Sequence, residues 1–220
     1  MKFDLSYTLD ALPRLLEGAL VTIQVACIGF ALSVTLATLL TVLRTSAASR
    51  LLDGVIAVYV SFIRGTPLLI QIFLVYYVLP VVGIDLGPVT AGILAITLNS
   101  AAYVLEILRG GLNSVPHGHL EAARALGVGA PVLWWKVILP QVFINSIPPL
   151  VNEFTLVVKA TPLLSVITVV ELMRVSQQIF SSNYHPVEVL AGAFVLYFII
   201  CFVVSRFSVR LEQHFNLRRA

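Results

Sequence analysis

The chain has 220 residues, of which 59% are hydrophobic and only 11% are charged, and its mean hydropathy is +0.97. A soluble domain carries roughly 25% charged residues, so the composition excludes a soluble protein and predicts an all-α integral membrane protein. The net charge of +3 does not indicate nucleic-acid binding, because the basic residues are spread along the chain at the edges of apolar runs.

Five apolar runs are long enough to cross a bilayer, which takes about 20 residues of helix. The first run holds 26 uncharged residues from Gly18 to Leu43 and follows acidic residues, so it is not a cleaved signal peptide, whose apolar region has roughly 7–15 residues. A shorter stretch at 160–170 cannot span and is predicted to be re-entrant or interfacial. Cys27 and Cys201 lie inside apolar runs, so we expect small buried side chains and no disulfide. The predicted spans cover residues 16–43, 54–82, 89–108, 137–158 and 187–205.

Basic residues are divided unevenly between the two sides of these spans. Nine lie in the loops after the first and third spans and in the C-terminal tail, and four lie on the opposite side. Because Lys and Arg favour cytoplasmic loops, the N-terminus is predicted to lie outside and the C-terminus in the cytoplasm. The nine are Arg44, Arg50, Arg109, Arg124, Lys136, Arg206, Arg210, Arg218 and Arg219, and the four are Lys2, Arg14, Lys159 and Arg174.

The loop at about residues 114–130 has the features of a short cytoplasmic helix. Glu121 suits an early helical position, where a negative charge complements the helix dipole, and Gly127 is a natural helix stop. Ala122 and Ala123 leave the helix with little side-chain bulk, so a partner's groove can approach its backbone. The alternative is a helix that lies on the bilayer surface.

This loop carries a motif with fixed spacing: Glu121-Ala122-Ala123, then Gly127, then Val137-Ile138-Leu139-Pro140. It resembles the signature of permease subunits of bacterial ATP-binding-cassette (ABC) importers, from which it departs only in Val137 for isoleucine. In that family the loop is the coupling helix that docks on the cytoplasmic ATPase. The resemblance therefore implies ATPase-coupling roles for Glu121, Ala122, Ala123, Arg124, Gly127 and Pro140.

Further motifs resemble the branch of these permeases that takes up polar amino acids. They are Phe62-Ile63-Arg64-Gly65-Thr66-Pro67-Leu68, the third-span segment 98–111, Leu139-Pro140-Gln141 and the segment 147–154. The resemblance covers about residues 12–212. It implies a type I ABC importer permease fold, with about five transmembrane helices and a cytoplasmic coupling helix, in one domain of residues 1–220 with a core at about 16–208. Many members have Lys-Asp-Thr-Ser-Leu where this chain has Lys159-Ala160-Thr161-Pro162-Leu163, which weakens the case for arginine or lysine as the substrate unless a partner subunit supplies the contact.

Polar residues inside the predicted spans are candidates for the substrate pathway. Glu153 lies deep in the fourth span, five residues after Pro148, and a carboxylate in hydrocarbon should face a cavity, a partner or a pathway. Pro148 and Pro149 are expected to break this helix. The alternative role for Glu153 is an ion pair with Lys159. The predicted pathway residues are Glu153, Asn152, Asn99, Thr66 and Thr161.

Two other polar groups are assigned to structure. Arg64 interrupts the second span and is expected to anchor the cytoplasmic end of a span rather than to gate the pathway. Glu106 and Arg109 are three residues apart and are expected to pair on one helix face. His117 and His119 lack a nearby third ligand, so no metal site is predicted.

The sequence has no Walker motif G-x-x-x-x-G-K-[ST] and no nucleophile–base constellation. The chain is therefore predicted not to be an enzyme, and ATP and Mg are expected on a partner ATPase. The predicted function is the permease subunit of an ABC importer that moves a polar amino acid across the bacterial inner membrane. The expected partners are a second permease chain, identical or related, two ATPase subunits, a periplasmic or lipid-anchored solute-binding protein, and membrane lipid. The alternatives are a self-sufficient ion-coupled carrier or channel that uses Glu153, and an inert scaffold subunit.

Overall fold

The computed structural model describes residues 3–47 and 49–216, and every regular element within these ranges is helical. The elements are α1 (Leu5–Ala47), α2 (Arg50–Gly65), α3 (Leu68–Phe73), the π-helix η1 (Leu74–Val78), the 3-10 helix η2 (Leu79–Val82), α4 (Pro88–Asn113), α5 (His117–Ala125), α6 (Ala130–Leu133), the π-helix η3 (Trp134–Ile138), α7 (Leu139–Ala160), the 3-10 helix η4 (Thr161–Ile167), α8 (Leu172–Asn183) and α9 (Pro186–Asn216).

Four helical segments are long and apolar enough to cross a membrane, and a fifth span exists if one bent pair is counted as a single span. The bent pair is the second predicted span, which turns by 110° between α2 and the helices that begin with α3. Thr66 is extended, with φ −125° and ψ 145°, because the ring of Pro67 disfavours helical geometry in the residue before it. The predicted all-helical membrane fold is confirmed, but this span is not a straight helix.

The two segments that follow α7, η4 and α8, differ from the sequence predictions. The stretch expected to be re-entrant or interfacial continues from α7 as η4, and its Leu164 and Ile167 are fully buried against other helices. The helix α8 was not predicted, because its sequence is too polar to stand out in an apolar chain. Cys27 is exposed and Cys201 is half-buried, so the expectation that both are buried is wrong, whereas both are free thiols as predicted.

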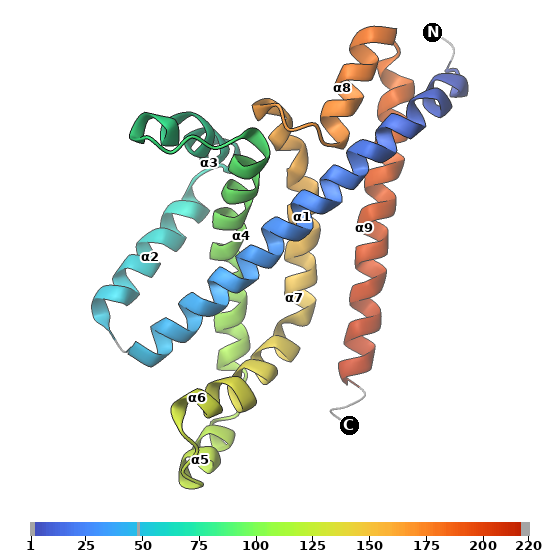
Figure 1. Ribbon diagram of the computed structural model, residues 1–220. Helices are drawn as coiled ribbons and strands as arrows, with labels where there is room; N and C mark the ends of the chain where they lie inside the picture. The colour runs from blue at the N-terminus through green and yellow to red at the C-terminus, as the bar shows by residue number, and fades with distance from the viewer. Residues whose placement is uncertain (1–2, 48, 217–220) are drawn as a thin grey trace.

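The helix α1 runs diagonally across α4, α7 and α9 (Figure 1). Its close contact with α4 depends on Gly29, where a Cβ atom would lie 2.9 Å from Cγ2 of Ile96. Beside it, the hydroxyl of Ser33 donates to the carbonyl of Thr97 at 3.1 Å. Small residues of this kind let helices in a membrane approach closely, and here they bring α1 and α4 together.

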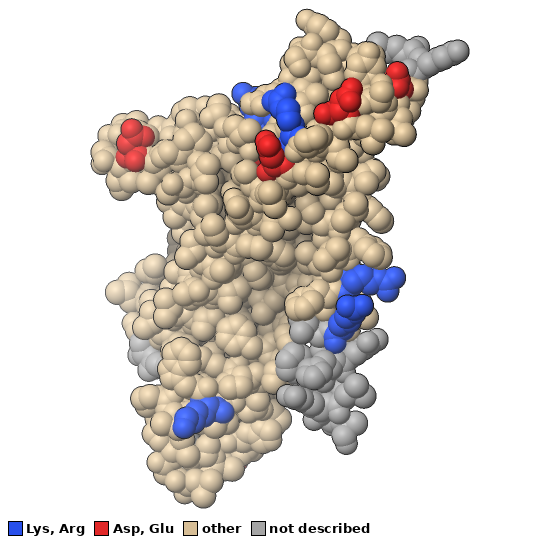
Figure 2. All heavy atoms as spheres, turned by 45° about the vertical axis from the view of Figure 1, so that its right-hand side comes forward, with Lys and Arg blue, Asp and Glu red and all other residues tan. Residues whose placement is uncertain are grey.

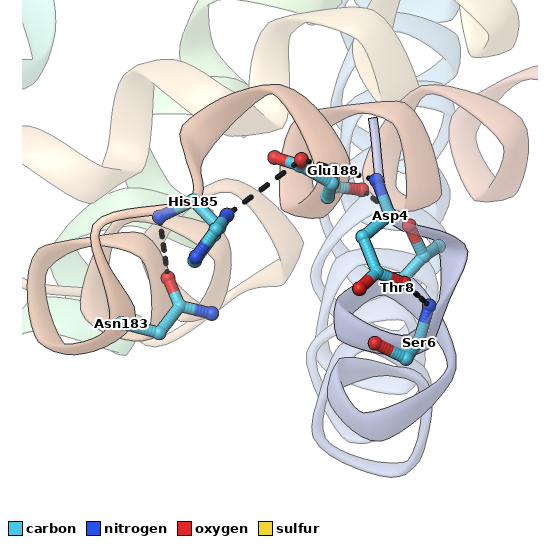
Figure 3. A network of polar contacts seen from close by, with 6 residues as sticks. All are labelled: Asp4, Ser6, Thr8, Asn183, His185 and Glu188. Carbon is cyan, nitrogen blue, oxygen red and sulfur yellow. Dashed lines mark hydrogen bonds and ion pairs between the residues drawn. The ribbon is translucent and has the colours of Figure 1, made fainter. Parts of the chain in front are cut away.

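The start of α1 is fastened to the turn before α9 at the end of the molecule opposite α5 (Figure 1). Figure 3 shows this network: Thr8 donates to the carbonyl of Glu188 at 2.9 Å, and the Glu188 carboxylate lies 3.6 Å from the ring nitrogen Nδ1 of His185. The Tyr7 ring stacks on His185 with 3.6 Å between centroids. The starts of the first and last helices are therefore held together at this end.

Charged side chains lie toward the two ends of the face in Figure 2, and the band between them is uncharged. The exposed surface is rich in large apolar residues, including Phe194, Phe198 and Phe202 on α9. Such a surface suits lipid or partner helices and not water.

Candidate functional site

A small cavity lies between α3, α4 and α7, with a volume of about 230 Å³. Its polar lining consists of Asn99, Ser100 and Tyr103 from α4 and Glu153 from α7. Apolar side chains, among them Leu68 and Leu156, form the remainder of its wall. The cavity therefore collects the polar groups of two spans at one point.

Glu153 is the acidic group of this cavity and is only 7% exposed. The hydroxyl of Ser100 donates to its Oε1 at 2.8 Å. Among the described residues no other group donates to this carboxylate, so Oε2 is left for a further donor. Lys159, the alternative partner, lines a different groove between α7 and α9. The helix α7 runs unbroken through both prolines, so the expected helix break beside Glu153 is wrong.

Gln71 ties the bend of α2 and α3 to the cavity. Its amide nitrogen donates to the carbonyl of Ile63 and to the hydroxyl of Thr66, both at 2.9 Å, and its oxygen accepts from Nδ2 of Asn99 at 2.9 Å. The amide thus satisfies a carbonyl that the bend has freed. It also accepts from one of the two N–H groups of Asn99 and leaves the Asn99 oxygen as an acceptor.

The free acceptors of the cavity are the second oxygen of Glu153 and the oxygen of Asn99, and the Tyr103 ring adds a π surface. The second N–H of Asn99 and the hydroxyl of Tyr103 remain as donors. A carboxylate, an amide oxygen and an aromatic face together suit a cationic group such as an ammonium.

The structure brings some of the predicted pathway residues together and separates others. Glu153 and Asn99 share the cavity, and Thr66 joins them through Gln71. Asn152 lies on another face of α7, about 100° around the helix from Glu153, and lines the groove of about 750 Å³ beside α9. Thr161 is fully buried and donates to the carbonyl of Val158 at 2.9 Å.

Sequence reasoning missed Gln71, Ser100 and Tyr103 as members of the site. Gln71 could have been found as a lone amide in an apolar run, and Ser100 as the neighbour of Asn99. Their pairing with Asn99 and Glu153 depends on tertiary contacts between residues 28 and 53 positions apart.

Arg64 lies over the ring of Tyr103. Its guanidinium carbon is 5.8 Å from the centroid of the Tyr103 ring. It lines a second cavity of about 530 Å³ with Glu106 and Arg109. The expected pair between these two residues is confirmed, with 2.7 Å between Nη2 of Arg109 and Oε2 of Glu106.

The helix α5 carries the motif of the loop and ends as the sequence predicts. Gly127 has φ +71°, and the amide of Val128 donates to the carbonyl of Ala123 at 3.1 Å, which is the Schellman arrangement of a helix end. Glu121 and Ala122 are exposed and Ala123 is buried. Pro140 is exposed in the first turn of α7, and the side chain of Arg124 lies outside the described residues.

Apolar side chains near α5 are exposed as well. Leu126 is 82% exposed and Trp135 is 71% exposed. Large apolar groups at an exposed position next to a polar helix indicate a surface for a protein partner.

Comparison with known proteins identifies the family. The family model described as a binding-protein-dependent transport system inner membrane component matches residues 29–217. The chain belongs to this family. The L-cystine transport system permease protein TcyB of Bacillus subtilis is 40% identical, over 94% of this chain and 86% of the relative. The glutamine transport system permease protein GlnP of Escherichia coli K12 is 36% identical, over 99% of this chain and all of the relative.

Solved structures agree with the fold of this permease. A crystal structure of an amino acid ABC transporter with histidines matches with a TM-score of 0.87 and 31% identity, over 97% of this chain and 100% of that chain. The MetNI methionine ABC transporter in an inward-facing conformation matches with a TM-score of 0.69 at 19% identity. The predicted type I ABC importer permease fold is confirmed.

The permease is a transport component and not an enzyme, since ATP hydrolysis in this family resides on a separate subunit. It is a multi-pass inner membrane protein of a family that works with ATPase and substrate-binding partners. The alternative of a self-sufficient ion-coupled carrier or channel is not favoured.

Proposed function

We propose that the permease moves an amino acid and that the cavity of Glu153 receives the α-ammonium group of this solute. The observation that carries the proposal is a buried carboxylate with one donor, facing a cavity that also presents the oxygen of Asn99 and the ring of Tyr103. An ionised carboxylate inside a membrane costs at least a few kcal/mol, and a bound cation offsets that cost. The names of the relatives, which include transport systems for L-cystine and glutamine, support the same class of solute.

The solute has an uncharged side chain. Ala160 lines the cavity, at the position where many members of the polar amino-acid branch carry an aspartate. With Glu153 engaged by the α-ammonium, the described lining offers no second carboxylate for a cationic side chain. Glutamine therefore fits this cavity better than arginine or lysine.

Binding of radiolabelled amino acids to the assembled transporter in nanodiscs tests the site. Glu153→Gln keeps the size of the side chain and its hydrogen bonding but removes the charge, and we expect at least tenfold weaker binding. Asn152→Ala is the matched control, because it alters the neighbouring residue on the other face of α7 and should leave binding unchanged. Equal affinity of the two variants and the wild type would disprove the role of Glu153.

Ala160→Asp tests the charge of the solute. The added carboxylate should shift competition against the bound solute from glutamine toward arginine and lysine. A variant that binds its amino acids in the wild-type order of preference would show that Ala160 does not set specificity.

The working assembly has two permease chains, two ATPase subunits that hold ATP and Mg, and a solute-binding protein that is periplasmic or lipid-anchored. The ATPases dock on α5, with Glu121, Ala122, Ala123, Arg124, Gly127 and Pro140 in or near the contact. The small residues and the exposed Leu126 support this docking surface. Gly127→Trp and Glu121→Lys should uncouple uptake from ATP hydrolysis in a permease that still inserts, and normal uptake in both variants would refute the assignment.

The end with α5 faces the cytoplasm and the end with the start of α1 faces outside. In the sequence, the loops and the tail assigned to the α5 side hold nine basic residues and the opposite side holds four, which supports this orientation. In cells that express the permease without Cys27 and Cys201, single cysteines at Ser46, Gly129 and Asn216 should be shielded from an impermeant thiol reagent. Cysteines at Asp85 and Asn183 should be labelled. The reverse pattern would invert the topology.

A further inference from the structure

A hydrogen bond joins α5 to α7, in addition to the chain that connects α4, α5 and α7 in sequence. Nδ1 of His119 lies 2.9 Å from Oε1 of Gln141, which is the third residue of α7. The amide nitrogen of Gln141 donates to the carbonyl of Val137 at 2.7 Å, so its oxygen is the atom that faces the histidine. Nδ1 of His119 must therefore carry the proton and donate it.

Packing supports the same attachment. The buried side of α5 presents Ala123 to a cluster that contains Leu133, Trp134 and Ile138, all of them just before α7. A displacement of α5 is thus carried to the first turns of α7. The end of α4 is also bonded to α7, since the amide of Asn145 donates to the hydroxyl of Ser114, the C-cap residue of α4, at 2.6 Å.

The helix α7 connects this attachment to the cavity. Glu153 follows Gln141 by twelve residues, which is about 18 Å along an unbroken helix, and α7 has no break over this length. The partner of Glu153 in the cavity, Ser100, is on α4. Any movement of α7 relative to α4 therefore acts on the bond between Ser100 and Glu153.

The crossing of α4 and α7 lies between these two points. A Cβ atom on Gly111 would meet the hydroxyl of Ser146 and the carbonyl of Val142, so the helices are in direct backbone contact there. With this contact fixed, a push at Gln141 tilts α7 and changes the separation of α4 and α7 at the cavity.

From these contacts we propose that His119 is a positioning residue, which transfers the movement of α5 to α7 through Gln141 and so changes the cavity around Glu153. The proposal rests on the proposed function, in which the ATPases move α5. The hydrogen bond selects α7 as the helix that responds, because it joins α5 to α7 and not to α4.

The test is nucleotide-dependent labelling inside the cavity. Leu156 lines the cavity, so Leu156→Cys in a permease that lacks Cys27 and Cys201 reports access of a small thiol reagent. The assembled transporter is labelled without nucleotide and after trapping with ATP and vanadate. His119→Ala should retain the ATPase subunits and basal hydrolysis, but the ratio of the two labelling rates should fall at least fivefold toward one.

Two further variants separate a transfer role from a general loss of structure. His119→Gln presents an amide donor to Gln141 and should restore most of the labelling ratio. Gln141→Leu should reproduce the loss, and the double variant His119→Ala with Gln141→Leu should lose no more than either alone, because the two residues act through one bond. Gln178→Ala, an exposed amide on α8, is the control and should change nothing.

An unchanged labelling ratio in His119→Ala would overturn the proposal. Loss of the ATPase from this variant would also overturn it, since His119 would then act at the partner's surface and not on α7. The readout needs no bound solute, so a failure of Glu153 to bind an amino acid is distinguishable from a failure of the transfer.

Discussion

Two of the buried carboxylates, those of Glu171 and Glu153, have different surroundings. Glu171 is fully buried and accepts three hydrogen bonds, from the amides of Arg174 and Met173 at 2.7 and 3.0 Å and from the hydroxyl of Tyr197 at 2.8 Å. Glu153 accepts one from Ser100 and faces a cavity. The first carboxylate is satisfied within the chain and the second is not.

This difference indicates a structural role for Glu171 and a binding role for Glu153. Glu171 caps the start of α8 and joins it to α9, and it offers no room for a ligand. Glu153 keeps an unused oxygen beside an open space, where a solute can supply the missing donors. Burial alone does not distinguish the two, whereas the number of donors does.

The largest expected effect is on stability at Glu171. Glu171→Leu leaves two backbone amides and the Tyr197 hydroxyl without their acceptor, and each buried orphan costs about 1–3 kcal/mol. We expect a loss of roughly 3 kcal/mol or more in the free energy of unfolding. Glu153→Leu orphans only the Ser100 hydroxyl and removes an unpaired carboxylate, so it should change stability by less than about 1 kcal/mol. Thermal unfolding of the detergent-solubilised proteins measures both, and equal losses would erase the distinction between the two carboxylates.

The sequence predicted much of the fold, because long apolar runs require spanning helices. It also predicted the end of α5, since Gly127 has the positive φ that a helix end of this kind needs. Pro67 could have indicated the bend at Thr66, but the apolar composition on both sides led to the prediction of a single span over residues 54–82 with no bend assigned. Pro148 and Pro149 led to the prediction of a broken helix, which is wrong, because α7 continues through both.

The site was only half predictable, for reasons of geometry. Glu153 was identified from the cost of a carboxylate in lipid, but its helical face was not, and Asn152 was grouped with it although the two lie on different faces. Glu171 escaped notice because glutamate is not among the preferred helix caps. The partners Ser100 and Gln71 come from other helices, and no local pattern specifies which helices touch.

An intermediate effect is expected at Gln71, which supports the cavity without lining it. Gln71→Leu frees Asn99 from its hydrogen bond and leaves the carbonyl of Ile63 unpaired. Asn99 then loses its fixed orientation, and we expect about tenfold weaker solute binding, which corresponds to about 1.4 kcal/mol. The control is Gln177→Leu, on α8 away from the cavity. Unchanged affinity in Gln71→Leu would mean that the cavity does not depend on this amide to orient Asn99.

The smallest effect is a pH dependence that belongs to Glu171. Burial raises the pKa of its carboxyl above the ordinary value of 4.5, and the hydrogen bonds from Met173, Tyr197 and Arg174 oppose part of this shift. A raised pKa in the folded state means that the folded protein binds the proton more tightly than the unfolded chain. The stabilisation from this group is therefore complete below the unfolded pKa and is lost as the pH rises through the folded pKa.

Glu171→Gln cannot titrate, so lowering the pH from 7 toward 5 should raise the melting temperature of the wild type relative to this variant by a few degrees at most. The control is Asn183→Ala, which changes no buried acid. The difference in melting temperature between the wild type and this variant should not change between pH 7 and pH 5. A wild type that loses melting temperature relative to Glu171→Gln on acidification would show that the hydrogen bonds outweigh burial at this carboxyl.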